Sequence, residues 1–270
     1  MYAEAHARDL PIRRRGDGQI MIGSGARGWS FDPAPLSLGM SVDVPWDSIG
    51  AVPLVAVTGP GAADVTRCIA TLVERQGHRV GRAASDGVTI AGTQITPEPS
   101  ATVEGARQVL ADERVDVAIV EVSVASVLEH GLGFDQCRVG VVTGVEATQG
   151  ESAVPQRDQI AAHGIVVLAT EQTGVVVLNA DDPQAVDLRD WTSGALVLYS
   201  NEQSATERMP DGNVVRIVYR DGSHVYVLHE NQRVNLGALN TEVLTPAHML
   251  PAAAAVHALG IDIAIPPAGS

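Results

Sequence analysis

The chain has 270 residues, 45% of them hydrophobic and only 3% aromatic, which predicts one or two domains with aliphatic cores. Its formal net charge of −14 argues against nucleic acid and anionic membrane surfaces as partners, since both attract clustered lysine and arginine. No apolar run approaches the roughly 20 residues that span a bilayer, and the first residues lack a signal-peptide core. The two cysteines, Cys68 and Cys137, have no metal-ligand spacing, so we expect buried thiols in a cytoplasmic protein.

Residues 1–50 are predicted to form a hairpin followed by an irregular tail. Three arginines at 13–15 are followed by the turn G-D-G at 16–18 and by a short strand at 19–22. Glycines and prolines then interrupt the pattern as far as Pro45. The arginine triplet has two interpretations, an anion site or a solvated turn, and we favour the turn.

Residues 51–260 are predicted to form one α/β domain, because apolar β-branched runs alternate with helical patterns. This order indicates a doubly wound, mostly parallel sheet, whose ligands bind beyond the carboxyl ends of the strands. The loops expected there are 58–64, 85–87, 121–126, 143–150 and 179–183. We predict strands at 53–57, 80–85, 88–95 (a hairpin), 115–121, 138–143, 164–169, 174–178 and 195–199, and helices at 62–76, 102–111, 123–130, 155–163 and 183–189.

The end of the chain changes its pattern. Residues 205–245 have a period of two and the turn Asp221-Gly222, which predicts a small antiparallel β-meander inserted in the domain. An alanine-rich helix is predicted from 246 to 259, where Gly260 ends it. Residues 261–270 are expected to be a tail.

The stretch 52–67 combines a buried strand, the glycine turn T-G-P-G and the start of a helix, an architecture that binds phosphates. A working phosphate loop also needs a lysine and a Mg²⁺-binding Ser or Thr. This chain contains no lysine, and Ala62, Ala63 and Asp64 stand where Gly, Lys and Thr are wanted. A carboxylate at a helix N-terminus stabilises the helix dipole by about 0.3–1 kcal/mol, so we expect Asp64 to take the place of a phosphate there.

The order of these motifs resembles the central ATPase domain of the Mur ligase family, in the version found in the C-terminal region of cyanophycin synthetases. The resemblance rests on A-V-T-G at 56–59, S-D-G-V-T-I-A-G at 85–92, V-D-V-A-I-V-E at 115–121 and V-L-N-A-D-D-P at 177–183. A further segment, 16–27, is similar to one that precedes the ATP-grasp lobe of cyanophycin synthetases. The resemblance implies a P-loop NTPase-like fold, and we expect a degenerate form without the ATP-grasp lobe and the C-terminal ligase domain.

The family joins an amino acid to a carboxylate through an acyl-phosphate, using ATP and Mg²⁺. The resemblance matches Glu121 to the Mg²⁺-binding glutamate, while the metal-ligand histidine is replaced within 148–149 and an Arg-Gly-Gly motif is replaced by V-A-S at 124–126. Two of the matched segments also have a structural interpretation: Glu121 is suited to accept hydrogen bonds from loop amides, and 179–183 is suited to cap a helix. The degenerate nucleotide-site residues implied by the resemblance are Thr58, Gly59, Gly61, Asp64, Asn179 and Asp182.

We therefore expect a non-catalytic relative of cyanophycin synthetase, without catalytic residues or a cofactor, that acts as a scaffold or binding partner. One alternative is a module that still binds a nucleotide or small metabolite. Another is a component of an ATP-dependent acid–amino acid ligase completed by another chain. ATP and Mg²⁺ are expected only under these alternatives. The expected partners are further copies of the chain or a related ligase.

Overall fold

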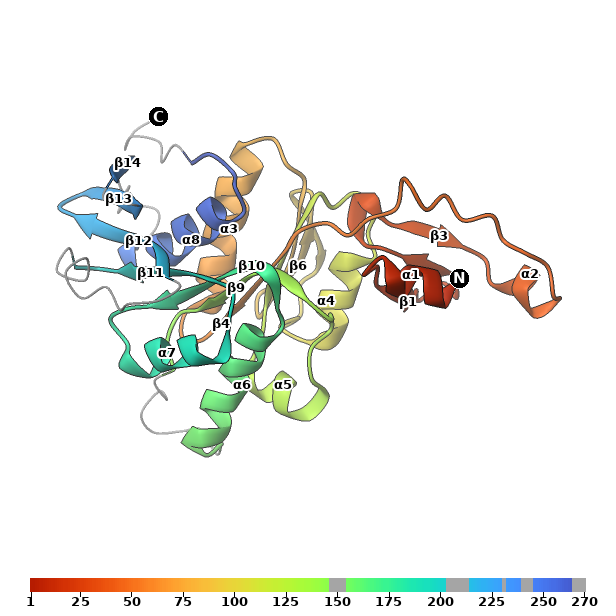
Figure 1. The fold of residues 1–270 in the computed structure, drawn as a ribbon, viewed down its shortest axis with the longest axis horizontal. Helices are drawn as coiled ribbons and strands as arrows, with labels where there is room; N and C mark the ends of the chain where they lie inside the picture. Colours follow the sequence, from red (N-terminus) through yellow and green to blue (C-terminus); the bar gives the residue numbers. More distant parts are fainter. Residues whose placement is uncertain (146–153, 203–213, 230–231, 239–244, 264–270) are drawn as a thin grey trace.

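The computed structural model describes residues 1–145, 154–202, 214–229, 232–238 and 245–263. A small N-terminal unit lies at one end of the longest axis, and a large α/β layer structure makes up the rest of the molecule (Figure 1). Parts of the predicted meander, the loop 143–150 and the tail lie outside the described residues.

The α/β part is built on one 11-stranded sheet, counted over the described residues. Its strands lie in the spatial order β14-β13-β12-β11-β10-β9-β4-β8-β5-β6-β7. Their bounds are β4 (Leu54–Thr58), β5 (Val80–Ala84), β6 (Gly87–Ile90), β7 (Thr93–Thr96), β8 (Val117–Glu121), β9 (Cys137–Val142), β10 (Thr170–Asn179), β11 (Ala195–Ser200), β12 (Val214–Asp221), β13 (His224–His229) and β14 (Gln232–Ala238).

Within this order, each adjacent pair of strands from β12 to β5 is parallel. The central strand β4 pairs with β8 and β9, with Val57 opposite Glu121 on one side and Val141 on the other. Antiparallel strands extend both edges, β6 and β7 on one side and β13 and β14 on the other. The predicted mostly parallel sheet is confirmed.

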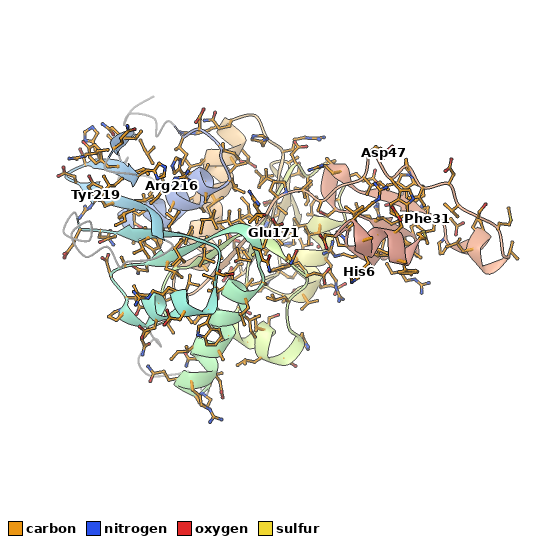
Figure 2. All side chains as sticks on the ribbon, in the orientation of Figure 1. His6, Phe31, Asp47, Glu171, Arg216 and Tyr219 are labelled. Carbon is orange, nitrogen blue, oxygen red and sulfur yellow. The ribbon has the colours of Figure 1, made fainter. Side chains whose placement is uncertain are left out.

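The predicted meander is present as the antiparallel strands β12, β13 and β14, and it continues the main sheet. The first of these strands pairs in parallel with β11, with Val218 opposite Tyr199. Figure 2 shows Arg216 and Tyr219 on this strand, at the end of the molecule away from the N-terminal unit.

Helices cover both faces of the sheet, as a doubly wound fold requires. One face carries α3 (Ala62–Arg75) and α8 (Pro246–Ala258), which pack against each other. The other face carries α4 (Val103–Leu110), α5 (Val124–His130), α6 (Gln156–Leu168) and α7 (Pro183–Asp187), which is followed by the short helix η2 (Leu188–Trp191). In Figure 1, α3 and α8 lie toward the top of the α/β part, and α5, α6 and α7 lie below the central strands.

The side chains of β4 show how the sheet is buried on both faces. Val55 and Val57 pack with α3 and α8, whereas Leu54 and Ala56 pack on the opposite side with α4 and α6. All four are less than 5% exposed. Continuous apolar runs in the sequence are the pattern that such a doubly covered strand requires.

The strand predicted at 164–169 is wrong. These residues form the second half of α6, which runs to Leu168, and the strand β10 begins directly afterwards at Thr170. Because β9 and β10 are parallel neighbours, the chain needs a crossover between them, and a helix is the usual solution. Burial of Val166 and Val167 against the sheet outweighs the β propensity of this run.

The N-terminal unit contains more structure than a hairpin and a tail. The predicted hairpin is present as β1 (Ile12–Arg14) and β2 (Ile20–Ile22), and β3 (Trp29–Phe31) extends it to a three-stranded antiparallel sheet. The unit also contains α1 (Tyr2–Ala7), the short helix η1 (Gly25–Arg27) and α2 (Ala34–Ser37). Its small core includes Ala5, Ile22, Phe31 and Ile49. Figure 2 labels Phe31 within this unit.

The unit is joined to the sheet by backbone contacts around Gly25. The amide of Ala26 donates to the carbonyl of Val115 at 2.8 Å, and the amide of Val52 donates to Ser24 Oγ at 3.1 Å. Gly25 has a φ of +56°, and a Cβ there would lie 2.6 Å from the oxygen of Val115. Only glycine fits this close approach between the two parts.

None of the helices in the described ranges is long and apolar enough to cross a membrane.

Candidate functional site

The fold brings most of the predicted site residues to one edge of the sheet. Thr58, Glu121 and Asn179 are the last residues of β4, β8 and β10, and Thr143 directly follows β9. These strands are parallel neighbours, so their carboxyl ends meet along a single edge, where α/β sheets bind ligands.

Thr143 holds the glycine loop in place. Its amide donates to the carbonyl of Thr58 at 2.9 Å, and its Oγ1 lies 3.1 Å from that oxygen and 2.8 Å from the carbonyl oxygen of Pro60. Gly59 has a φ of +105°, and a Cβ there would lie 2.5 Å from Thr143 Oγ1. The loop therefore passes so close to β9 that only glycine fits at this position.

Thr58 connects the loop to a buried histidine. Its hydroxyl donates to the carbonyl of Val122 at 2.9 Å and lies 2.8 Å from His163 Nδ1. Because its single proton goes to Val122, the hydroxyl accepts from His163 Nδ1–H, which fixes the tautomer of the ring. Burial lowers the pKa of His163, and the charge of Asp182 only partly opposes this effect. His163 is therefore a neutral structural partner of Thr58 near neutral pH.

Helix α3 begins with Gly61 as its N-cap, at a φ of 71°. Asp64 lies in the first turn, where its charge suits the helix dipole. Its Oδ1 accepts from Arg67 Nη1 at 2.5 Å, and its Oδ2 lies 3.9 Å from His248 Nε2 on α8. The same histidine nitrogen would lie 2.9 Å from a Cβ at Gly61, so His248 lies directly beside the start of the helix.

Arg67 also belongs to a charged network that continues along this edge. Its Nη2 donates to Asp86 Oδ2 at 2.7 Å, and Asp86 Oδ1 lies 2.7 Å from Arg82 Nη2. Arg82 is buried and its Nη1 donates to Thr66 Oγ1 at 3.2 Å. Burial would raise the pKa of Asp86, but the hydrogen bonds from Arg67 and Arg82 outweigh it and hold that pKa below its usual value.

Glu121 has a structural partner at the end of β8. Its Oε2 accepts a hydrogen bond from the amide of Ser85 at 2.6 Å, which ties β8 to the loop after β5. Across the part of the chain that the structure describes, no three His, Cys, Asp or Glu side chains lie close enough together to hold a metal ion. The replaced histidine position at 148–149 lies outside that part.

Asn179 and Asp182 are engaged by the protein's own backbone. Asn179 Nδ2 donates to the carbonyl of Thr143 at 2.9 Å. Asp182 caps α7 through Oδ1, which accepts from the amides of Gln184 and Ala185 at 2.9 and 3.4 Å. Its Oδ2 accepts from the amide of Val145 at 2.6 Å. The structure therefore shows the helix cap that the sequence offered as an alternative to a nucleotide contact at 179–183.

Both cysteines are buried, as the sequence predicts. Burial raises the pKa of each thiol to about 12, so both remain protonated at neutral pH and are poor nucleophiles.

The sequence reasoning missed Thr143, His163 and His248, and the network around Arg67 and Asp86. A signal existed for Thr143, because it ends an apolar run in the same way as Thr58 ends its own. No local sequence pattern marked His163 and His248, because α6 and α8 bring them to the glycine loop only in the folded protein.

A family described as a domain of unknown function, DUF4938, matches residues 1–197. The chain belongs to this family.

It is also homologous to cyanophycin synthetases. It is 30% identical over 272 residues to the enzyme of Crocosphaera subtropica, which covers 92% of this chain and 31% of that protein. The enzyme of Trichormus variabilis is 28% identical over 232 residues, covering 82% of this chain and 25% of the relative. The chain thus spans about a third or less of these relatives.

Solved structures identify the fold. A UDP-N-acetylmuramoyl-L-alanyl-D-glutamate–2,6-diaminopimelate ligase matches with a TM-score of 0.60 at 18% identity, over 79% of this chain and 44% of that one. A bifunctional folylpolyglutamate synthase/dihydrofolate synthase with bound Mn, AMPPNP and L-glutamate matches with a TM-score of 0.53 at 13% identity, over 79% of this chain and 55% of that one. The predicted fold of the Mur ligase central domain is confirmed.

Replacing Thr143 tests its role in holding the loop. We expect Thr143→Val to lower the free energy of unfolding by about 1–3 kcal/mol, because it removes a buried hydroxyl and leaves the carbonyl of Pro60 without this donor. Urea unfolding followed by circular dichroism measures the change. The matched control is Thr93→Val on the exposed edge strand β7, for which we expect less than about 0.5 kcal/mol. Equal effects of the two substitutions would contradict the role given to Thr143.

The buried His163 predicts a dependence of stability on pH. Its pKa in the folded state is lowered by burial, whereas the unfolded chain has a value of about 6.5. Below about pH 6.5 the unfolded state therefore binds more protons, and the free energy of unfolding falls as the pH falls. We expect His163→Asn to flatten this slope between pH 7 and 5, as measured by urea unfolding.

Two comparisons make this test specific. His257 also has a pKa lowered by burial and by nearby Arg216 and His229, so part of the slope should remain in the variant. The control His130→Asn removes an exposed histidine and should keep the wild-type slope. An unchanged slope in His163→Asn would show that this ring does not titrate in the expected way.

Proposed function

We propose that this chain is a non-catalytic relative of cyanophycin synthetase that acts as a cytoplasmic scaffold or binding partner. The observation that carries the proposal is the pairing of Arg67, in the second turn of α3, with two carboxylates. A phosphate-binding loop needs an available cation there, and this chain has no lysine. The guanidinium of Arg67 is held between Asp64 and Asp86 by hydrogen bonds of 2.5 and 2.7 Å.

The electrostatics of this edge support the proposal. Asp64, Asp86 and Glu121 bring three carboxylates to the region where a triphosphate would lie, and Arg67 and Arg82 already pair with two of them. Two like charges about 4 Å apart repel by roughly 1 kcal/mol in water and roughly 4 kcal/mol near a protein surface. Loss of a single electrostatic stabiliser of a transition state typically costs about 2.7–4 kcal/mol. Acyl-phosphate chemistry would have to overcome both effects.

One observation favours a second candidate, a module that binds a nucleotide or small metabolite without ligating it. Gly59 and Gly61 keep the positive φ values of a tight loop before a helix N-terminus. The folylpolyglutamate synthase that shares this fold was solved with Mn and AMPPNP. This candidate requires Arg67 to leave Asp64 or Asp86 when a phosphate binds.

We expect no ATP hydrolysis. With Mg²⁺, ATP and mixtures of amino acids present, phosphate release should stay at the level of a heat-denatured sample, because the loop lacks a lysine and a Mg²⁺-binding hydroxyl. The control is Glu121→Ala, which removes the carboxylate matched to the metal-binding glutamate. Turnover by the wild type that disappears in Glu121→Ala would show that the protein is an enzyme.

A binding measurement separates the two candidates. Calorimetric titration of the wild type with ATP and Mg²⁺ should give no saturable heat if the edge is closed by its own charges. Asp64→Asn removes one of the repelling carboxylates and one partner of Arg67. Saturable binding by the wild type, made tighter by Asp64→Asn, would favour the nucleotide-binding module.

The proposed scaffold role includes assembly, either with further copies of the chain or with a related ligase. We expect light scattering at micromolar concentration to give a multiple of the 28.2 kDa chain mass. An interface of ordinary size buries about 1,200–2,000 Å² and would persist at this concentration. A strictly monomeric mass, together with no ligase co-purifying from the native cytosol, would overturn the scaffold role.

A further inference from the structure

A second site lies at the opposite edge of the sheet from the glycine loop. A cavity of about 1110 Å³ is lined by β1 and the turn after it, by α4, and by the segments that precede β8 and β9. These segments lead into the amino ends of the parallel strands, whereas the glycine loop follows the carboxyl end of β4. The cavity lining includes five arginines: Arg13, Arg14, Arg15, Arg107 and Arg114.

Two of these arginines are engaged by the protein. Arg15 Nη1 donates to Glu113 Oε1 at 2.9 Å and to Ser30 Oγ at 3.0 Å. Arg114 forms a two-point pair with Asp112, with Nε and Nη2 donating at 2.9 and 2.7 Å. Their donors hold the rim of the cavity together.

Arg13 is different, because it is largely buried and poorly paired. Its side chain is 16% exposed, and its nearest carboxylate oxygen is Asp135 Oδ2, 3.9 Å from Nη2. Its Nη1 is buried and has no hydrogen-bond partner in the described part of the chain. Burial lowers the pKa of Arg13, which the charge of Asp135 opposes and that of Arg107 reinforces. A buried guanidinium with an unused donor is costly unless an acceptor is supplied.

Arg107 is also weakly paired. It lies on α4, and its ion pair is with Glu104 at 3.8 Å, a carboxylate that is 85% exposed. Such exposed pairs contribute little and exchange readily with other partners. The charge of Arg107 lowers the pKa of Arg13, and both guanidiniums line the same cavity.

We propose that this cavity binds a small metabolite through an oxyanion, a phosphate or carboxylate group held between Arg13 and Arg107. Guanidinium groups recognise such anions through paired hydrogen bonds, and a bound anion would balance the charge of Arg13, whose Nη2 lies 3.9 Å from the carboxylate of Asp135. The volume slightly exceeds the range of about 300–1,000 Å³ that is usual for small-molecule sites. Five carboxylates also line the cavity and disfavour ligands with many negative charges: Asp17, Glu104, Asp112, Glu113 and Asp135.

A second cavity of about 420 Å³ adjoins this one and shares Arg13, Phe134 and Asp135 with it. Its lining includes His6 from α1 and Glu171 from β10, both labelled in Figure 2. The body of a ligand anchored at Arg13 could therefore extend between the N-terminal unit and the sheet. The proposal is independent of ATP binding at the glycine loop.

The test is calorimetric titration of the full chain at low ionic strength, with inorganic phosphate in one arm and succinate in the other. We expect one saturable site, with chloride at the same ionic strength giving none. Tighter binding of phosphate would indicate a phosphorylated metabolite, and tighter binding of succinate a carboxylic acid. Arg107→Gln should weaken the tighter of the two by roughly tenfold or more, the effect of one charged hydrogen bond.

The matched control is Arg157→Gln, which removes an arginine that is 88% exposed on α6. Arg157→Gln changes the net charge by the same amount as Arg107→Gln and should bind the anion as tightly as the wild type. Absence of a saturable site in both arms would overturn the proposal. Equal weakening by Arg157→Gln and Arg107→Gln would also overturn it, because it would show attraction to net charge alone.

A second variant, Arg13→Met, gives a thermal test that does not depend on calorimetry. Without added anion, its melting temperature should equal or exceed that of the wild type, because the poorly paired buried cation is gone. With the anion, the wild type should melt at a higher temperature and Arg13→Met should not shift, since only a bound ligand stabilises the folded state. An equal shift in both proteins would contradict the assignment of Arg13.

Discussion

The candidate site depends on the hydrogen bonds by which Thr143 holds the glycine loop. Its amide and hydroxyl meet the carbonyls of Thr58 and Pro60, so the end of β9 fixes the turn that leaves β4. That turn sets where α3 begins and therefore where Asp64 and Arg67 lie. The carbonyl of Thr143 in turn accepts from Asn179 and Tyr199, so the anchor itself is held by the next two strands.

The charged side chains at this edge are paired mainly with one another. Arg67 and Arg82 neutralise Asp64 and Asp86, and Glu121 is bound to the amide of Ser85. A ligand that carries phosphate would have to break pairs that already exist, whereas a phosphate loop with a lysine has its cation available. The loop makes a tight turn before a helix N-terminus while the charges beside it pair with one another, and this combination supports the proposed binding role without catalysis.

Much of the fold could be predicted from the sequence, because buried parallel strands leave continuous β-branched runs and the Asp221-Gly222 turn marks a hairpin. The run at 164–169 misled the prediction, since burial on two sides makes a helix as apolar as a strand. Within the site, the loop and its missing lysine could be predicted from local pattern. The contacts of His163 and His248 could not, because they join segments far apart in the chain.

The distribution of arginine distinguishes the two edges of the sheet. At the carboxyl edge, Arg67 and Arg82 each have a carboxylate partner within 2.7 Å. At the amino edge, Arg13 and Arg107 have partners no closer than 3.8 Å, although Arg13 is largely buried. A chain with a net charge of −14 has ample carboxylates, yet Arg13 Nη1 at this edge is buried without a hydrogen-bond partner in the described part of the chain. The weakly paired guanidiniums of Arg13 and Arg107 therefore lie at the amino edge, beside the N-terminal unit and away from the glycine loop, which is why the proposed anion site is placed there.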